Sequence, residues 1–345
     1  MKLETGKLDS ELLKKIVFGK ITYRSDDVSV RPGIGEDCAV MDFGDYDCIM
    51  STDPISSAVS DIGRLAIHIT CNDIASNGVQ PLGIMLAVML PEGTTAEDVE
   101  CIMGQAAETA ADVKVEIIGG HTEITPAVKQ PVIVSTAIGK ALKGVSQSGN
   151  DMVPGDFIMM TKAVGLEGSG IIACDYEEQL SDILSAKELA RAKSFLDLVS
   201  VVPEGIAAGT VGTHGMHDIT EGGILGAVWE MCQISGRGAQ VWKDEIPVEP
   251  ETVKICDHYD IDPLRLISSG SMVIIVPKDT REEMEVAMAQ AGVSCSIIGR
   301  IEEADFGIRL AEGGAPEAGA SVSPEDLAEI DPPYMDELYK VVGKE

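Results

Sequence analysis

The feature that most constrains how this chain folds is an alternation of strand-like and helical patterns. It occurs twice along the chain, and a polar stretch separates the two regions. In the first region, apolar runs at 46–53, 83–90, 115–120 and 131–139 alternate with helical patterns that end near Gly78 and at 113. The second has strand-like runs at 157–165, 271–277 and 294–301 and helical patterns at 186–200, 221–235 and 280–292. Because strands and helices alternate without strict regularity, we expect a mixed α/β and α+β architecture.

The polar, turn-rich stretch SQSGNDMVPGD predicts a boundary between two domains, 1–148 and 149–345. The opening segment predicts a helix capped by Asp9 or Ser10, and Thr95 with Asp98 forms the pattern of a capping box. The segment from about Ala311 is rich in Gly, Pro and acidic residues, so we expect it to be peripheral.

Charge and composition exclude several classes of function. The formal net charge of −31 disfavours binding to nucleic acid or to an anionic membrane. No apolar run reaches the roughly 18 residues of a membrane span, and the N-terminus lacks an apolar signal core. The eight Cys form no CxxC or zinc-binding spacing, which favours reduced thiols. We therefore expect a cytoplasmic protein without nucleic-acid or membrane partners.

Five short motifs place an acidic residue or a His near the end of an apolar element, often beside Gly. They are GIGEDCAV (Asp37), STDPI (Asp53), CNDIASNG (Asp73), IIGGHTEIT (His121 and Glu123) and MHDITEGGI (Asp218). Carboxylates are the usual ligands of Mg²⁺, and Gly lets the backbone approach an anion closely. Each motif alone is typical of a helix cap or a solvated charge, but together they indicate a site for phosphate and several metal ions.

In this order the motifs resemble those of the AIR synthase (PurM-like) ATP-binding superfamily, and most closely its branch related to HypE, the hydrogenase expression/formation protein. The resemblance runs from about residue 30 to 300. It implies an N-terminal α/β domain, a C-terminal α+β domain, and a homodimer in which the N-terminal domains pair into a barrel-like core. It also implies ATP binding without a Walker A loop, and the chain indeed contains no GxxxxGK[ST].

The resemblance also assigns roles to particular residues. The expected Mg²⁺ ligands are Asp37, Asp53, Asp73 and Asp218. The residues expected to contact ATP are Gly33, Gly35, Asn72, Gly119, Gly120, Gly222 and Gly223. A bound metal ion would compensate the burial of Asp73 on an apolar helix, which is otherwise costly. The helix after Gly222 and Gly223 is expected to direct its N-terminus at phosphate.

His121 and Glu123 are the expected catalytic residues. Several relatives have Asp at the position of His121, and an imidazole offers no oxygen ligand. A phosphate contact or a proton transfer therefore suits His121 better than Mg²⁺ ligation, with a purely structural role as the alternative. Glu123 is a candidate base or a further metal ligand.

The activity that the resemblance implies is transfer of the ATP γ-phosphate to an amide or carbonyl oxygen of a small molecule or a carrier-protein end, with the acceptor unknown. The alternatives are a thiamine-monophosphate-type kinase and a noncatalytic ATP-binding scaffold in hydrogenase maturation. Two departures from HypE put its usual reaction in doubt. The sequence ends DELYKVVGKE without the terminal Cys that carries the substrate group, and Ser269 stands where HypE typically has Glu.

Overall fold

The structure is a computed structural model that describes residues 6, 8–56, 60–147, 149–316, 322–333 and 335–342. In this part of the chain, the first sheet has six strands in the order β1-β2-β3-β6-β4-β5, and only β4 and β5 pair in parallel. Its strands are β1 (Val28–Val30), β2 (Ala39–Asp42), β3 (Tyr46–Ile55), β4 (Pro81–Leu90), β5 (Glu116–Ile124) and β6 (Val132–Leu142).

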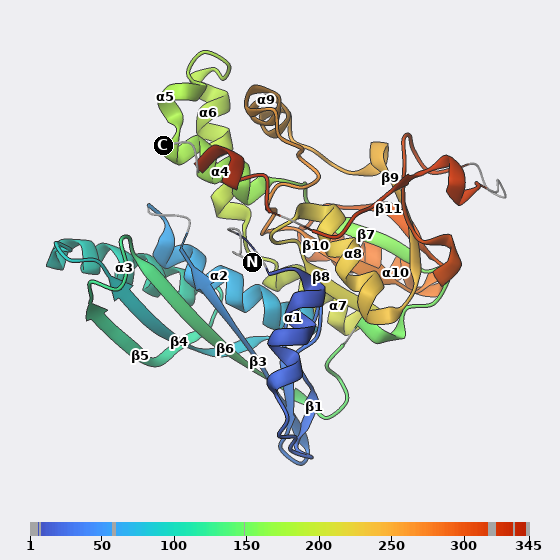
Figure 1. Ribbon diagram of the computed structural model, residues 1–345, viewed down its shortest axis with the longest axis horizontal. Coiled ribbons are helices and arrows are strands. Elements are labelled where there is room, and N and C mark those ends of the chain that lie inside the picture. The colour runs from blue at the N-terminus through green and yellow to red at the C-terminus, as the bar shows by residue number, and fades with distance from the viewer. Residues whose placement is uncertain are drawn as a thin grey trace.

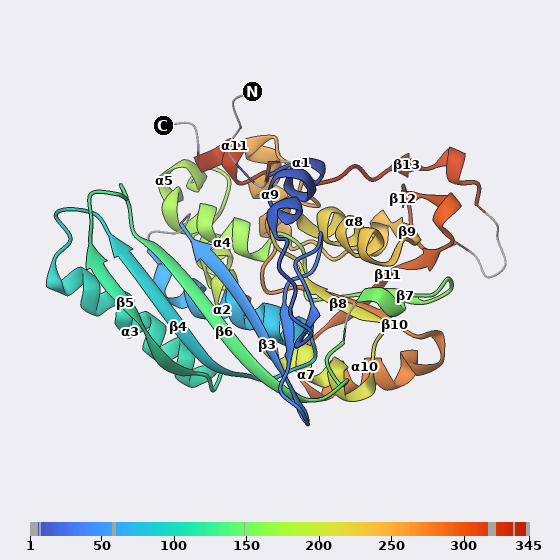
Figure 2. The same ribbon diagram turned by 60° about the horizontal axis from the view of Figure 1, so that its bottom comes forward.

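A second sheet follows, with seven strands among the described residues in the order β13-β12-β9-β11-β7-β10-β8. These are β7 (Phe157–Thr161), β8 (Gly215–Asp218), β9 (Gly238–Trp242), β10 (Met272–Val276), β11 (Cys295–Glu302), β12 (Ile308–Ala311) and β13 (Ala328–Glu329). Helices cover both faces of this sheet, with α8 on one side and α7 and α10 on the other (Figure 2). That arrangement explains why β10 is apolar at every position: Met272 and Ile274 belong to one core, Val273 and Ile275 to another.

The helices confirm most of the expected positions and caps. They are α1 (Ser10–Ile16), α2 (Ile62–Ser76), α3 (Ala96–Asp112), α4 (Leu166–Asp175), α5 (Glu177–Leu180), α6 (Ala186–Lys193), α7 (Val202–Val211), α8 (Gly223–Ser235), α9 (Pro250–Tyr259), α10 (Arg281–Gln290) and α11 (Tyr339–Val342). Asp9 caps α1, and Thr95 with Asp98 forms the capping box of α3. Helices and sheets are mixed, as expected.

One expected helix is divided in two. The pattern at 186–200 predicts a single helix, but α6 ends at Lys193 and a 3₁₀ segment, Ser194–Leu198, follows. The hydroxyl of Ser194 donates to the carbonyl of Arg191 at 2.7 Å, a local bond that competes with the helical ladder. No single helix among the described residues is long and apolar enough to cross a membrane, although residues 186–198 and 202–211 pass that test as a pair bent by 49°.

The first sheet has one covered face and one open face. Helices α2 and α3 lie against the covered face (Figures 1 and 2). Side chains alternate between the two faces along each strand. Ser51 and Asp53 of β3 accordingly share the face of the buried Ser135, whereas Met85 of β4 is 41% exposed on the other. The covered face is therefore where this sheet contributes to a buried site.

Helix α2 joins the two halves of the molecule. Its C-terminal end lies so close to α7 that a Cβ at Gly205 would come within 2.4 Å of the Ala75 carbonyl oxygen, and one at Gly209 within 2.7 Å of the Gly78 Cα. One apolar core contains residues of α2 together with Met216 of β8, so it crosses between the halves. Residue 148, where the boundary between domains 1–148 and 149–345 was expected, lies outside the described residues, and the boundary stays a prediction.

Candidate active site between the two halves

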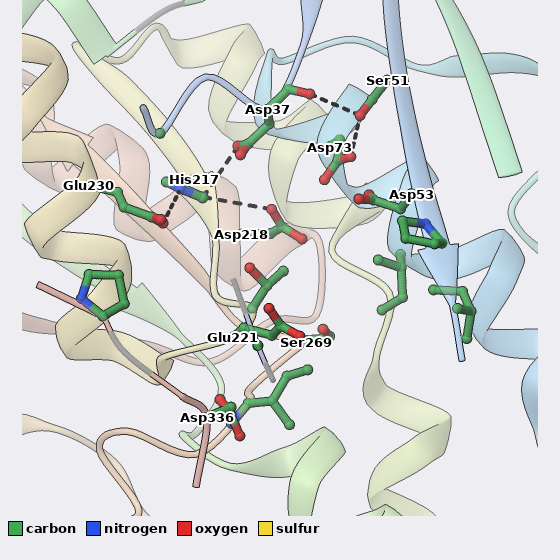
Figure 3. A pocket seen from close by; sticks show the side chains of 18 of the residues that line it. Asp37, Ser51, Asp53, Asp73, His217, Asp218, Glu221, Glu230, Ser269 and Asp336 are labelled. Carbon is green, nitrogen blue, oxygen red and sulfur yellow. Dashed lines mark hydrogen bonds and ion pairs between the residues drawn. The ribbon is translucent and has the colours of Figure 1, made fainter. Parts of the chain in front are cut away.

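A cavity of about 680 Å³ lies between the first sheet, α2, and the second half of the chain (Figure 3). Its lining is strongly acidic. The acidic side chains are Glu36, Asp37, Asp53, Asp73, Glu167, Asp218, Glu221, Glu230 and Asp336. Among the described residues that line it, none is Lys or Arg. A polyanionic ligand therefore needs added cations to bind in this cavity.

Three of the expected metal ligands reach the cavity from the first half. Asp37 precedes β2, Asp53 lies on β3, and Asp73 lies in the last turn of α2. The hydroxyl of Ser51 is 2.5 Å from Asp73 Oδ2 and 2.9 Å from the carbonyl oxygen of Asp37. Ser51 therefore fixes the distance between two of these segments, a role that its place in the STD motif did not indicate.

The ionised form of Asp73 is disfavoured by its surroundings. Burial raises its pKa well above the ordinary value, and the charges of Asp53, Asp218 and Asp37 raise it further. Such mutual repulsion is unfavourable unless a cation lies among the groups. The electrostatics of this cluster thus suit a divalent ion.

Asp218 approaches from the second half, at the end of β8. Its backbone N–H donates to the hydroxyl of Ser76 at 3.1 Å, which ties β8 to the end of α2. The side chain is fully buried, yet neither carboxylate oxygen has a hydrogen-bond partner in the described part of the chain. Buried carboxylates normally have such partners. The two oxygens of Asp218 therefore have no hydrogen-bond donor among the described residues and lie beside three further carboxylates. Such a group of oxygen ligands suits Mg²⁺.

His217 lies beside Asp218 and is almost completely buried (Figure 3). Its Nδ1 is 3.2 Å from Asp37 Oδ2, and its Nε2 is 3.2 Å from Glu230 Oε2. Burial lowers the pKa of His217, but the charge of Asp37 and the contacts with Asp218 and Glu230 outweigh this and raise it well above the ordinary value. Glu230 lies in the second half of α8, the helix that follows β8. None of the five sequence motifs includes it.

The other end of the cavity contains residues that the motifs missed. Glu167, near the start of α4, is buried beside Ser269, and its Oε2 has no hydrogen-bond partner in the described structure. Burial raises the pKa of Glu167 to about 7, and the proximity of Ser269 opposes part of this rise. Tyr339 of α11 donates its hydroxyl to Glu221 at 3.1 Å. Glu221 stands within the MHDITEGGI motif, but nothing in the sequence relates Glu167 to it.

The C-terminal segment is part of this site, which corrects the expectation that it is peripheral. Asp336 is buried, and its carboxylate accepts hydrogen bonds from the backbone N–H groups of Gly222, Ile267 and Leu338. Burial raises its pKa to about 6 in spite of these bonds. The start of α8 was expected to receive phosphate, but there the chain provides its own carboxylate to the N–H of Gly222. Gly222 and Gly223 do not line the cavity.

The other expected nucleotide contacts divide into two groups. Gly33 and Gly35 line the cavity. Asn72 does not, because its side chain is fully buried and points to the segment before α7. Its Nδ2 donates to the carbonyl of Val199 and its Oδ1 accepts from the N–H of Val201, both at 2.8 Å. Asn72 therefore links α2 to the second half of the chain.

His121 and Glu123 lie away from the carboxylates of the same chain. Strand β5 continues through both residues to Ile124 at the edge of the sheet. They pair with Ala87 and Met89 of β4 and so share the open face, opposite to Asp53. Their side chains are 69% and 48% exposed and approach each other at 3.4 Å.

Gly119 and Gly120 are also strand residues rather than parts of an anion-binding turn. A Cβ at Gly120 would come within 1.9 Å of the Leu86 carbonyl oxygen, so this Gly allows close pairing with β4. Neither Gly lines the cavity.

Comparisons with known proteins agree with this architecture. Residues 35–141 match the profile of the AIR synthase related protein N-terminal domain, and residues 153–310 match that of its C-terminal domain. A Methanocaldococcus jannaschii protein, provisionally named hydrogenase expression/formation protein, is 31% identical over 80% of this chain and 82% of its own length. The carbamoyl dehydratase HypE of Rhodobacter capsulatus is 27% identical over 76% and 77%.

Solved structures show the same fold at lower identity. A hydrogenase maturation protein HypE in complex with ATP superimposes with a TM-score of 0.66, at 22% identity over 93% of this chain and 97% of that chain. AaThiL complexed with AMPPCP and TMP gives a TM-score of 0.69, at 18% identity over 89% and 93%. Two matched domain profiles in sequence order, and a relative above 30% identity over most of both chains, lead to one conclusion. This chain belongs to the AIR synthase related protein family and has its two-domain, PurM-like fold.

Proposed function

We propose that this protein is an ATP- and Mg²⁺-dependent enzyme that transfers the γ-phosphate of ATP to an amide or carbonyl oxygen of a small molecule or a carrier-protein end. The convergence of Asp37, Asp53, Asp73 and Asp218 on one cavity carries the proposal. When bound, Mg²⁺ would neutralise the polyphosphate and leave the γ-phosphorus open to attack. The similarity to proteins solved with ATP and with AMPPCP supports the choice of nucleotide.

The protein's own contribution is positioning. Ser51 holds Asp73 and the Asp37 segment in place, and Ser76 holds Asp218. Because these carboxylates come from segments that different hydrogen bonds fix, they can hold ions and phosphates in one arrangement before the acceptor enters. Placing reactants in this way accounts for much of the catalysis of phosphoryl transfer.

The charge of the cavity favours an acceptor without a phosphate group. No Lys or Arg is present among its described lining residues, so an anionic acceptor such as thiamine monophosphate would depend wholly on the metal ions. An uncharged carbamoyl or carboxamide group meets no such difficulty. It could receive hydrogen bonds from a protonated Glu167 or donate them to its ionised form, since the pKa of that residue is raised to about 7.

The position of Glu167 is also relevant to Ser269, where this sequence differs from HypE. HypE typically has Glu at this position, and here the side chain of Glu167 lies beside Ser269. A carboxyl group therefore still occupies this part of the cavity, although it comes from α4. We include in the proposal that Glu167 takes over the contact with the acceptor.

The open face of the first sheet supports the proposed homodimer. It exposes the apolar side chain of Met85, next to the strand that carries His121 and Glu123. Pairing of two such faces would bury these residues at the interface, so any catalytic role for His121 and Glu123 is proposed only for the dimer. A cytoplasmic location likewise stays a prediction.

ADP release measured with different acceptors tests the proposal. A carbamoylated cysteine peptide is expected to stimulate turnover, and Asp73→Asn to abolish it, while the exposed Asp182→Asn leaves it unchanged. Stimulation by thiamine monophosphate instead would show a kinase of that type. Nucleotide binding without turnover with any acceptor would show a noncatalytic scaffold, and either of these two results would overturn the proposed activity.

A further inference from the structure

The donor set at one end of the carboxylate cluster includes a nitrogen. One ligand atom each from Asp37, His217 and Asp218 lie within 4.8 Å of one another. The nitrogen that faces the two carboxylates is Nδ1 of His217, 3.2 Å from Asp37 Oδ2 and 3.7 Å from Asp218 Oδ1. Atoms at these separations can surround one ion, whose bonds to oxygen and nitrogen ligands are roughly 2.0–2.2 Å long.

The hydrogen bonding of these groups is incomplete. Both ring nitrogens of His217 and both carboxylate oxygens of Asp218 are buried and make no hydrogen bond of normal geometry in the described part of the chain. Their contacts with Asp37 and Glu230 are ion pairs rather than aligned hydrogen bonds. Buried polar groups that lack hydrogen bonds call for an explanation, and a bound ion is one of the usual ones.

The far side of the imidazole has the partner that a metal-bound His normally has. Nε2 lies 3.2 Å from Glu230 Oε2, and Glu230 is held on α8 (Figure 3). In metal sites, a carboxylate that accepts from one ring nitrogen fixes the tautomer and directs the other nitrogen at the ion. Glu230, His217 and the two aspartates are arranged in this order.

We propose that Nδ1 of His217 is a direct ligand of the ion held by Asp37 and Asp218, and that this position selects a first-row transition ion such as Mn²⁺ over Mg²⁺. The inference rests on the proposed function, because it concerns one of the ions that accompany ATP. Mn²⁺ shares the preference of Mg²⁺ for carboxylates but, as a first-row transition ion, accepts an imidazole ligand more readily than Mg²⁺ does. The all-carboxylate group around Asp53 and Asp73 remains suited to Mg²⁺.

Pulsed electron paramagnetic resonance on the full chain with Mn²⁺ and AMPPCP tests this assignment. We expect modulation from a directly bound ¹⁴N that becomes ¹⁵N when only the protein's histidines are labelled, so that adenine nitrogen is excluded as the source. The signal is expected to vanish in His217→Asn and to persist in the exposed control His258→Asn. Because the labelled wild-type protein already decides the question, a variant that fails to fold does not remove the test.

Metal competition gives a second readout. Mn²⁺ is expected to displace Mg²⁺ from one site of the wild-type protein, and Glu230→Gln to weaken Mn²⁺ binding about 10- to 100-fold. Bound Mn²⁺ that couples to phosphorus but to no protein nitrogen would overturn the inference and leave the proposed function intact. If neither Mn²⁺ nor the nucleotide binds, the proposed function fails and the inference fails with it.

Discussion

The carboxylate of Asp336 accepts a hydrogen bond at 2.7 Å from the backbone N–H of Gly222, the N-cap residue of α8, which begins within the MHDITEGGI motif. Two further backbone donors, Ile267 and Leu338, share that carboxylate. We predict that Asp336→Ala lowers the free energy of unfolding by about 2–3 kcal/mol, because it leaves buried N–H groups without acceptors. Urea denaturation measures this, with the exposed Asp326→Ala as control. Equal loss in both variants would refute the stabilising role of Asp336.

The contact of Asp336 with Gly222 could not be predicted from local sequence patterns. Local patterns correctly predicted the cap at Thr95 and narrowed the first cap to Asp9 or Ser10, of which the structure has Asp9, because such caps depend on residues three or four positions apart. The contact of Asp336 with Gly222 spans more than a hundred residues and leaves no periodic signal. The four aspartates were found because each lies at the end of an apolar element, and the fold brings such ends to one cavity.

The face of the first sheet on which a residue lies could not be predicted from the sequence either. His121 and Asp53 both belong to strands of the first sheet, but which side each residue faces depends on register. The pairing of β4 with β5 shifts in register between Ile84 and Met85, and no sequence pattern predicts this irregularity. The motif therefore identified the residues without showing that they face away from the carboxylates of their own chain.

Glu167 predicts a specific dependence of stability on pH. Its pKa rises from 4.5 to about 7 on folding, so the folded state binds this proton more tightly than the unfolded chain. The contribution of Glu167 to the free energy of unfolding is fully present below about pH 4.5. It is lost as the pH rises through 7, by about 3 kcal/mol in total. Urea denaturation of the metal-free protein at pH 5 and pH 8 should show this loss in the wild type and a smaller one in Glu167→Gln. An unchanged pH dependence in the variant would contradict the assignment.

Asn72 is predicted to act in stability rather than in nucleotide binding. Asn72→Ala leaves the carbonyl of Val199 and the N–H of Val201 without their partner, which should cost about 2–4 kcal/mol. Nucleotide affinity at a temperature where the variant remains folded should change little. A large loss of affinity with unchanged stability would restore Asn72 to the nucleotide site.

The open face of the first sheet predicts the oligomeric state. Met85→Asp places a charge on the open face that is proposed to pair with a second copy, so analytical ultracentrifugation should find a monomer. Val286→Asp is the matched control, since Val286 is 55% exposed on α10, outside that face. A wild-type monomer, or a dimer that survives Met85→Asp but not Val286→Asp, would contradict the proposed pairing.

Calorimetric titration with ATP tests the central claim most directly, namely that the converging carboxylates bind nucleotide through divalent ions. We predict binding to the wild-type protein with Mg²⁺, none with excess EDTA, and none to Asp73→Asn. The metal-free Asp73→Asn protein should also melt a few degrees higher than the wild type, because the substitution removes a buried charge that its neighbours repel. ATP binding that persists with EDTA, or that Asp73→Asn leaves intact, would contradict the account.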